Sequence, residues 1–200
     1  VSDDHRNITL LESFPQKELK TVAAKSAALT EDKLRFTIKP KHYQQLVALR
    51  DEAMSRGGVK DASKKSVPAK LDFQGETYKV DMRFKGDWLD HLDTARWSYR
   101  VNMKGAKTLM GMKRFSIQTP GTRSHMFEWI VHEVFRREGG ITPRYDFVPV
   151  DINNKGFGVY ALEEHFGKRL IEFHGRKEGP ILKFDESVLF KSADVFDDAL

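Results

Sequence analysis

Thr77-Tyr-Lys-Val-Asp-Met-Arg-Phe-Lys85 alternates apolar and polar side chains, which is the two-residue period of a β-strand with one buried face. Lys70-Leu-Asp-Phe-Gln74 alternates in the same way just before it, and Gly75-Glu76 separates the two stretches. Two alternating stretches joined by a short turn that contains glycine predict a β-hairpin. We therefore take an antiparallel hairpin as the starting point of the fold.

The same periodicities predict further elements on both sides of this hairpin. Further strands are expected at Leu34–Ile38, Ser98–Met103, Arg114–Gln118 and Pro180–Phe184, together with a second hairpin, 147–152 and 158–162, around Asn153-Asn154. Helices are expected from Pro40 to the Gly57-Gly58 pair, over Ser124–Glu138 and near Phe166–Phe173. Strands, one main helix and then strands again predict an α+β fold with a mostly antiparallel sheet packed on that helix.

The 124–138 helix is expected to bury one face. Its apolar residues fall at helical spacing, at Phe127, Ile130, Val131, Val134 and Phe135. From the inward positions of the strands we predict one shared core, made of Phe84, Phe115, Ile130, Val134, Phe135, Val148 and Tyr160.

Length and composition exclude several classes of protein. The chain has 200 residues, 40% of them hydrophobic, and contains no cysteine, so disulfide scaffolds and cysteine nucleophiles are excluded. No apolar run approaches the ~20 residues of a membrane span. We expect a loosely ordered arm over residues 1–32 and one domain over 33–200. Because the chain begins at Val1 and ends in a mixed apolar and acidic segment, we also expect it to be a processed protein or a fragment.

Basic residues gather in two places. Residues 96–114 carry six cations and no acid, namely Arg96, Arg100, Lys104, Lys107, Lys113 and Arg114. This stretch is either an ordinary solvated sheet face or a site for an anion, and its few aromatic residues argue against nucleic acid. The strand end Arg83-Phe-Lys-Gly-Asp87 places Arg83 and Lys85 on one face, and Gly86 leaves the backbone open to a phosphate.

Glu133 lies beside the apolar stripe of the main helix, where a carboxylate usually needs a basic partner. We predict that Lys113 or Arg114, on the preceding strand, forms an ion pair with it. This pair is either a structural salt bridge or a phosphate-binding pair of the kind found in protein kinases. The seven histidines lack the spacing of a zinc site, and no Gly-x-Ser-x-Gly elbow is present, which argues against a zinc enzyme and a serine hydrolase.

Seven short motifs, in order over residues 70–185, resemble those of the spore coat protein H (CotH) kinase family. They are Arg83-Phe-Lys-Gly-Asp87, Ser98-Tyr-Arg-Val-Asn-Met103, Gly111-Met-Lys-Arg-Phe-Ser-Ile117, Ile130-Val-His-Glu-Val-Phe-Arg-Arg-Glu-Gly139, Pro143-Arg144 with Phe147-Val148, Gly158-Val-Tyr-Ala-Leu-Glu-Glu164, and Gly179-Pro-Ile-Leu-Lys183. The sequence departs from the family pattern at Asp87, Ser98, Phe127 and Asn154-Lys-Gly-Phe157.

The resemblance implies an atypical protein-kinase-like lobe with a mostly antiparallel sheet on one main helix. It further implies a secreted-type enzyme that uses ATP and Mg²⁺ to phosphorylate serine in partner proteins of a spore coat or cell envelope. Lys113 and Glu133 would be catalytic. The nucleotide would be bound by Arg83, Lys85, Gly86, Arg114, Glu164 and Lys183.

The resemblance implies that the carboxylates for Mg²⁺ and for the catalytic base lie C-terminal to these motifs, and we identify no Asp-x-x-x-x-Asn followed by a metal-binding Asp between Lys183 and Leu200. We therefore expect the chain to lack part of the catalytic apparatus and to bind ATP poorly by itself. Two alternatives remain open, a non-catalytic scaffold of the same family and a module that binds polyanions through residues 96–114.

Overall fold

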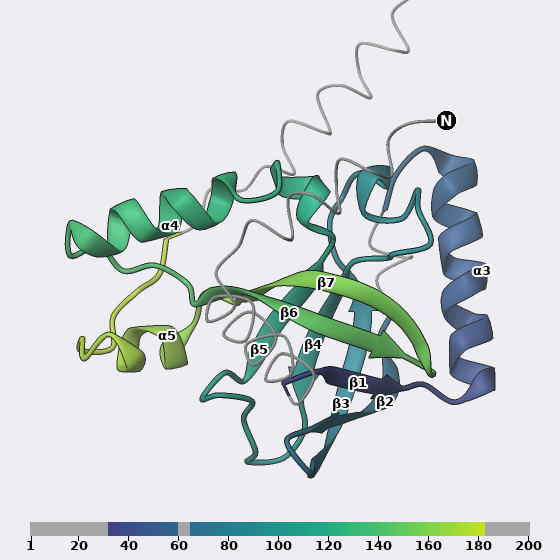
Figure 1. Ribbon diagram of the computed structural model, residues 1–200, viewed down its shortest axis with the longest axis horizontal. Coiled ribbons are helices and arrows are strands. Elements are labelled where there is room, and N and C mark those ends of the chain that lie inside the picture. Colours follow the sequence, from purple (N-terminus) through teal and green to yellow (C-terminus); the bar gives the residue numbers. More distant parts are fainter. Residues whose placement is uncertain (1–31, 60–64, 183–200) are drawn as a thin grey trace, which may run out of the picture.

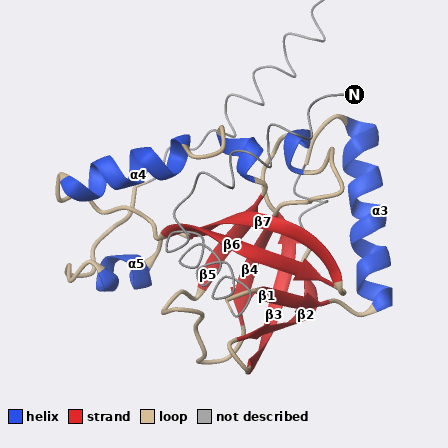
Figure 2. Cartoon of the chain, in the orientation of Figure 1, coloured by secondary structure: helices blue, strands red, loops and turns tan. Residues whose placement is uncertain are grey.

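The structure is a computed structural model that describes residues 32–59 and 65–182. Its centre is a closed β-barrel, shown in Figures 1 and 2. Around the barrel the strands follow the order β1-β2-β3-β4-β5-β7-β6. Their bounds are β1 Leu34–Thr37, β2 Val67–Phe73, β3 Glu76–Phe84, β4 Tyr99–Met103, β5 Arg114–Gln118, β6 Tyr145–Ile152 and β7 Lys155–Glu164.

Parallel pairing of β1 with β6 closes the barrel, while every other neighbouring pair is antiparallel. Leu34 pairs with Val150 and Phe36 with Ile152. Beyond the last pair, the backbone N–H of Asn153 donates to the Phe36 carbonyl at 2.9 Å. β1 therefore fills the gap between β2 and β6, and neither strand is left with an open edge along this stretch.

Every second residue of each strand points into the barrel, so side chains of the strands fill its interior. Val80, Met82 and Phe84 on β3 are fully buried, and they pair in register with the buried Met103, Val101 and Tyr99 of β4. Phe115 and Ile117 of β5 and Tyr160 and Leu162 of β7 complete this inner layer. The inner face of the sheet is thus covered by the sheet itself.

Helix α3 (Pro40–Arg56) stands along one side of the barrel, at the right of Figure 1. Pro40 occupies its first turn, and Gly57 ends it in the left-handed conformation at φ +77°. Its buried residues are Leu46, Leu49 and Ala53. Helix α3 packs against the barrel through these three residues and so contributes to the hydrophobic core.

Helix α4 (Phe127–Arg137) extends away from the barrel on the other side, with α5 (Lys168–Phe173) below it in Figure 1. No residue of α4 is buried. Four residues of its apolar stripe are about half exposed or more, at 65% for Phe127, 49% for Ile130, 54% for Val134 and 59% for Phe135, while Val131 is partly buried.

The predicted architecture, a kinase-like lobe with an open sheet packed on the 124–138 helix, is therefore wrong. The sheet closes into a seven-stranded barrel, so its apolar face needs no helix to cover it. The shared core is confirmed for Phe84, Phe115, Val148 and Tyr160 and is wrong for Ile130, Val134 and Phe135. Helical periodicity identified the apolar face of α4 but gave no information on what covers it.

Most individual elements are confirmed to within a few residues, and β5 matches its predicted bounds. Of the predicted strand Pro180–Phe184, residues 180–182 are not in a strand and the rest lies outside the described residues. The predicted N-terminal arm also lies outside them, except for Asp32.

Two phenylalanine truncations test this core. Phe115→Ala removes a fully buried ring from the barrel and is expected to lower the free energy of unfolding by about 3–5 kcal/mol. Phe135→Ala, the matched control on the exposed face of α4, is expected to change it by no more than about 0.5 kcal/mol. Urea unfolding of both variants measures the difference, and equal losses would contradict the closed barrel as the main core.

Candidate functional site

A row of polar side chains crosses the outer face of the barrel. Cα registers link one residue on each of five adjacent strands, in the order Arg83, Arg100, Ser116, Glu163 and Tyr145. Four residues of this polar row are next in sequence to a buried residue that points inward, such as Phe84, Ile117 or Leu162, and Tyr145 lies two residues before Phe147, which alternates with the buried Val148. Strand alternation therefore directs the row to the outer face.

Lys85, the residue after β3, lies at one end of this face and is only 6% exposed. Its ammonium group donates hydrogen bonds to Glu163 Oε2 and, at 2.6 Å, to Gln118 Oε1. The Gln118 amide donates in turn to Glu128 Oε2 of α4 at 3.4 Å and to Glu163 Oε2 at 3.5 Å. We call Lys85, Gln118, Glu128 and Glu163 the lysine cluster.

Positive charge exceeds negative charge around the lysine cluster and the polar row. The cations are Arg83, Lys85, Arg100, Arg114 and Arg123, and the carboxylates that act on them are Asp87, Glu128 and Glu163. Burial lowers the pKa of Lys85, and the Glu163 carboxylate opposes this shift. Burial also lowers the pKa of Arg100, whose Nε is buried without a hydrogen-bond partner. Such an unused buried donor is suited to an anionic oxygen.

Gly86 allows the chain to turn sharply after Lys85. Its φ is +88°, and a Cβ built on it would lie 1.9 Å from Cδ2 of the buried His91 ring. The loop is held to the barrel by two backbone bonds, Lys85 N–H to the Ser98 carbonyl at 3.0 Å and Ser98 N–H to the His91 carbonyl at 2.9 Å. Burial lowers the pKa of His91, and the charges of Lys85 and Arg123 act in the same direction.

The predicted ion pair between Lys113 or Arg114 and Glu133 is not formed. Lys113 Nζ donates to the carbonyl of Gly105, while Glu133 pairs with Arg136 on its own helix. Lys113 precedes β5, whereas α4 approaches the other end of that strand, where Gln118 lies. At about 3.3 Å per residue, this separates Lys113 from Gln118 by roughly 16 Å.

Glu164 is a buried partner of Arg144 inside one end of the barrel. Arg144 binds it through two parallel bonds, Nε to Oε2 at 2.8 Å and Nη2 to Oε1 at 2.6 Å. The same guanidinium donates to the Met110 carbonyl and lies 4.3 Å from the ring centre of Phe173. Both carboxylate oxygens are thus already paired, on the face opposite to Glu163. Lys183, also predicted in the site, lies outside the described residues.

The basic residues of the stretch 96–114 do not lie together on one anion-binding face. Lys104 pairs with Asp81 at 2.9 Å and Lys107 with Glu76 at 3.0 Å. Arg96 donates to the Val159 carbonyl and covers the ring of Tyr160 at 5.0 Å. Only Arg100 and Arg114 of the six cations belong to the surroundings of the lysine cluster.

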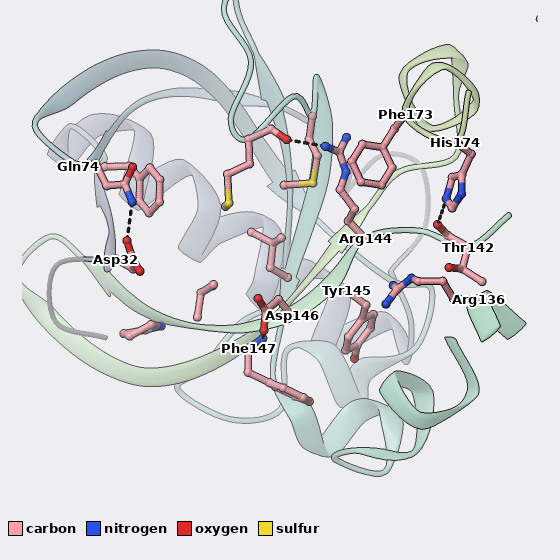
Figure 3. A pocket seen from close by; sticks show the side chains of 16 residues that line it. Asp32, Gln74, Arg136, Thr142, Arg144, Tyr145, Asp146, Phe147, Phe173 and His174 are labelled. Atoms are coloured by element: carbon pink, nitrogen blue, oxygen red, sulfur yellow. Dashed lines mark hydrogen bonds between the residues drawn. The ribbon is translucent and has the colours of Figure 1, made fainter. Parts of the chain in front are cut away.

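A cavity of about 730 Å³ lies at the end of the barrel occupied by Arg144. Figure 3 shows it between Tyr145, Asp146 and Phe147 of β6, Arg144, and Phe173 and His174 at the end of α5. Met110, Met112, Val148, Pro149 and Leu162 add apolar side chains to its wall.

The family model described as CotH kinase protein matches residues 82–198 of this chain. The match covers more than half of the sequence and begins one residue before Arg83, so it includes the whole polar row and the lysine cluster. The chain belongs to the CotH kinase family. No curated protein matches it. In the part of the chain that the structure describes, no helix is long and apolar enough to cross a membrane.

Of the residues that the sequence predicted in the site of this CotH-family chain, Arg83, Lys85 and Gly86 lie at this candidate site, whereas Gln118, Glu128, Tyr145 and Glu163, which lie beside them, were not among the predicted residues. Glu163 was overlooked in favour of its neighbour Glu164. Alternation from the apolar Leu162 could have placed Glu163 on the outer face. The contact between Lys85 and Glu163, separated by 78 positions, depends on strand order and leaves no local signal.

Two glycine substitutions test the turn after Lys85. Gly86→Ala and Gly57→Ala both place a side chain at positive φ, which costs roughly 1–2 kcal/mol. Only Gly86→Ala also collides with the His91 ring, because nothing lies within 4 Å of a Cβ at Gly57. We expect the larger loss of unfolding free energy for Gly86→Ala. Equal losses in urea unfolding would show that His91 does not pack against Gly86.

Proposed function

We propose that this CotH-family chain binds the phosphates of ATP on the outer face of the barrel and takes part in transfer of the γ-phosphoryl group to serine in a partner protein. The observation that carries this proposal is the lysine cluster beside the polar row, a buried lysine oriented by a carboxylate and a carboxamide, with Arg83 and Arg100 on the adjacent strands. Membership of a kinase family supports the phosphoryl-transfer step.

The charges and donors of the site fit a triphosphate. Phosphoryl transfer depends mainly on positioning the nucleotide and on stabilising the charge of the transferred group, and cationic donors supply both. Glu163 and Gln118 fix the Lys85 ammonium, while the unused Nε of Arg100 offers a further donor. Lys85, Arg83 and Arg100 would thus hold the phosphates, and Glu163 would orient Lys85.

Mg²⁺ is proposed as the ion that accompanies ATP, as in other phosphoryl transfers. Within residues 32–59 and 65–182, no three histidine, aspartate or glutamate side chains gather in an arrangement that would hold a metal ion. We therefore assign no magnesium ligand among these residues, and no step is derived from one.

For the acceptor, we propose a serine-rich protein of a spore coat or cell envelope, as the resemblance to the CotH family implies. The lysine cluster and the polar row support the nucleotide-binding part of this proposal and not the choice of acceptor. Arg114, Lys113, Glu133 and Lys183 remain candidates from the sequence, and the experiment below compares one of them with the lysine cluster.

Calorimetric titration of the 200-residue chain with Mg-ATP tests the proposal. Lys85→Met keeps an unbranched side chain but removes the charge, and Arg100→Gln removes the second cation. Because one charge-assisted hydrogen bond contributes about 1.5–3 kcal/mol, we expect either variant to weaken ATP binding by about tenfold or more. Lys113→Met is the matched control and is expected to leave affinity unchanged, since Lys113 binds the Gly105 carbonyl elsewhere.

Three results would contradict the proposal. The first is loss of ATP affinity in Lys113→Met but not in Lys85→Met, which would restore the site predicted from sequence. The second is equal affinity for ATP and for any polyanion, which would favour the polyanion module. Because this chain is expected to bind ATP only weakly by itself, the third is no ATP binding by the folded wild-type chain even at ATP concentrations high enough to detect weak binding, which would favour a non-catalytic scaffold.

A further inference from the structure

Helix α4 presents an uncovered apolar face to its surroundings. Phe127, Ile130, Val134 and Phe135 are 49–65% exposed and share one side of the helix. The contacts of α4 with the barrel come from another side, where Glu128 meets Gln118 and the His132 ring lies 5.4 Å from the Tyr145 ring. A cluster of large exposed apolar side chains of this kind marks an interaction surface.

The cavity of Figure 3 lies near the C-terminal end of this helix, with Arg136 of α4 in its wall. Its basic side chains already have partners, whereas the hydroxyls of Thr142 and Tyr145 are buried without a hydrogen-bond partner. Arg144 is bound by Glu164, Arg136 by Glu133, and the His174 ring lies 2.9 Å from the Thr142 carbonyl. Most of the remaining wall is apolar, so an apolar or aromatic side chain fits the cavity.

Basic residues follow in sequence two of the residues that line the cavity, Arg136 and His174. Arg137 at the end of α4 and Arg176 and Lys177 after α5 are exposed, and none of them has an ion pair among the described residues. An occupant that combines apolar and acidic residues would complement both the apolar face and this charge.

Residues 183–198 of the chain have this chemistry. The family match continues through residue 198, beyond the last described residue, Leu182, which is 94% exposed. The segment contains the apolar residues Phe184, Val188, Leu189, Phe190, Val195 and Phe196 and the acids Asp185, Glu186, Asp194, Asp197 and Asp198, against two lysines. It follows α5, whose Phe173 lines the cavity, so covalent attachment gives it a high effective concentration there.

We propose that residues 183–198 bind to the apolar face of α4 and to the adjoining cavity, with their acidic residues toward Arg137, Arg176 and Lys177. Another side of α4 carries Glu128, which accepts a hydrogen bond from Gln118 of the lysine cluster. Binding of the segment would therefore also hold α4, and with it Glu128, against that cluster. This inference does not depend on nucleotide binding.

The absence of cysteine makes a single-site spin label a direct test. Phe190→Cys in the full chain, labelled with a nitroxide, is expected to broaden the amide NMR signals of residues 127–137 and 168–173. The signals of α3, residues 40–56 on the other side of the barrel, are the internal control and are expected to stay sharp. Unaffected α4 signals, or equal broadening of α3 and α4, would overturn the proposal.

Two further samples separate the alternatives. Val134→Glu, on the exposed face of α4, is expected to abolish the broadening, while Met54→Glu on α3 is expected to leave it unchanged. In a mixture of spin-labelled chains without ¹⁵N and unlabelled chains with ¹⁵N, α4 signals are expected to stay sharp. Broadening in that mixture would make a second copy of the chain the occupant, and persistence of broadening in Val134→Glu would place the segment elsewhere; either result overturns the proposal.

Discussion

Pairing of β1 with both β2 and β6 is the constraint on which the architecture depends. Phe36 of β1 pairs with Leu71 of β2 on one side and with Ile152 of β6 on the other. Asn153 reinforces this closure, because its side-chain oxygen accepts the Ile38 N–H at 2.7 Å. Once the sheet is closed, one side of every strand is committed to the interior. The polar side chains on the other side of each strand then lie on the outer face. The candidate site results from this separation of inward apolar and outward polar side chains.

The sequence was sufficient to predict the local elements but not their assembly. Alternation over 77–85 and the asparagine pair at 153–154 indicated the two hairpins, because strand and turn preferences are local. Closure depends on β1 pairing with a strand more than a hundred positions away, and no period in the sequence reports such a pairing. For the same reason, only part of the candidate site could be predicted from the sequence. Arg83 and Lys85 were recognisable at a strand end, while Glu163 and Gln118 come together with them only through strand order.

The exposed face of α4 and the lysine cluster are linked through one helix. A barrel that fills its own interior leaves most of the apolar stripe of α4 exposed among the described residues, and the helix instead reaches the barrel through Glu128 and His132. Glu128 lies beside Gln118, which binds Lys85. Whatever binds the apolar face of α4 would therefore influence the geometry of the cationic site through this short hydrogen-bond path.

The central claim is that Lys85 is a desolvated cation prepared for phosphate. Burial disfavours its charged form, so its pKa in the folded chain lies below the model-peptide value of 10.5 despite the opposing effect of Glu163. A triphosphate bound beside it would favour the charged form and raise that pKa. The most direct measurement is an NMR pH titration of the Lys85 side chain, without and with saturating ATP. We expect a pKa below 10.5 that rises when ATP binds, whereas a Lys85 pKa that ATP leaves unchanged would contradict phosphate binding at this lysine.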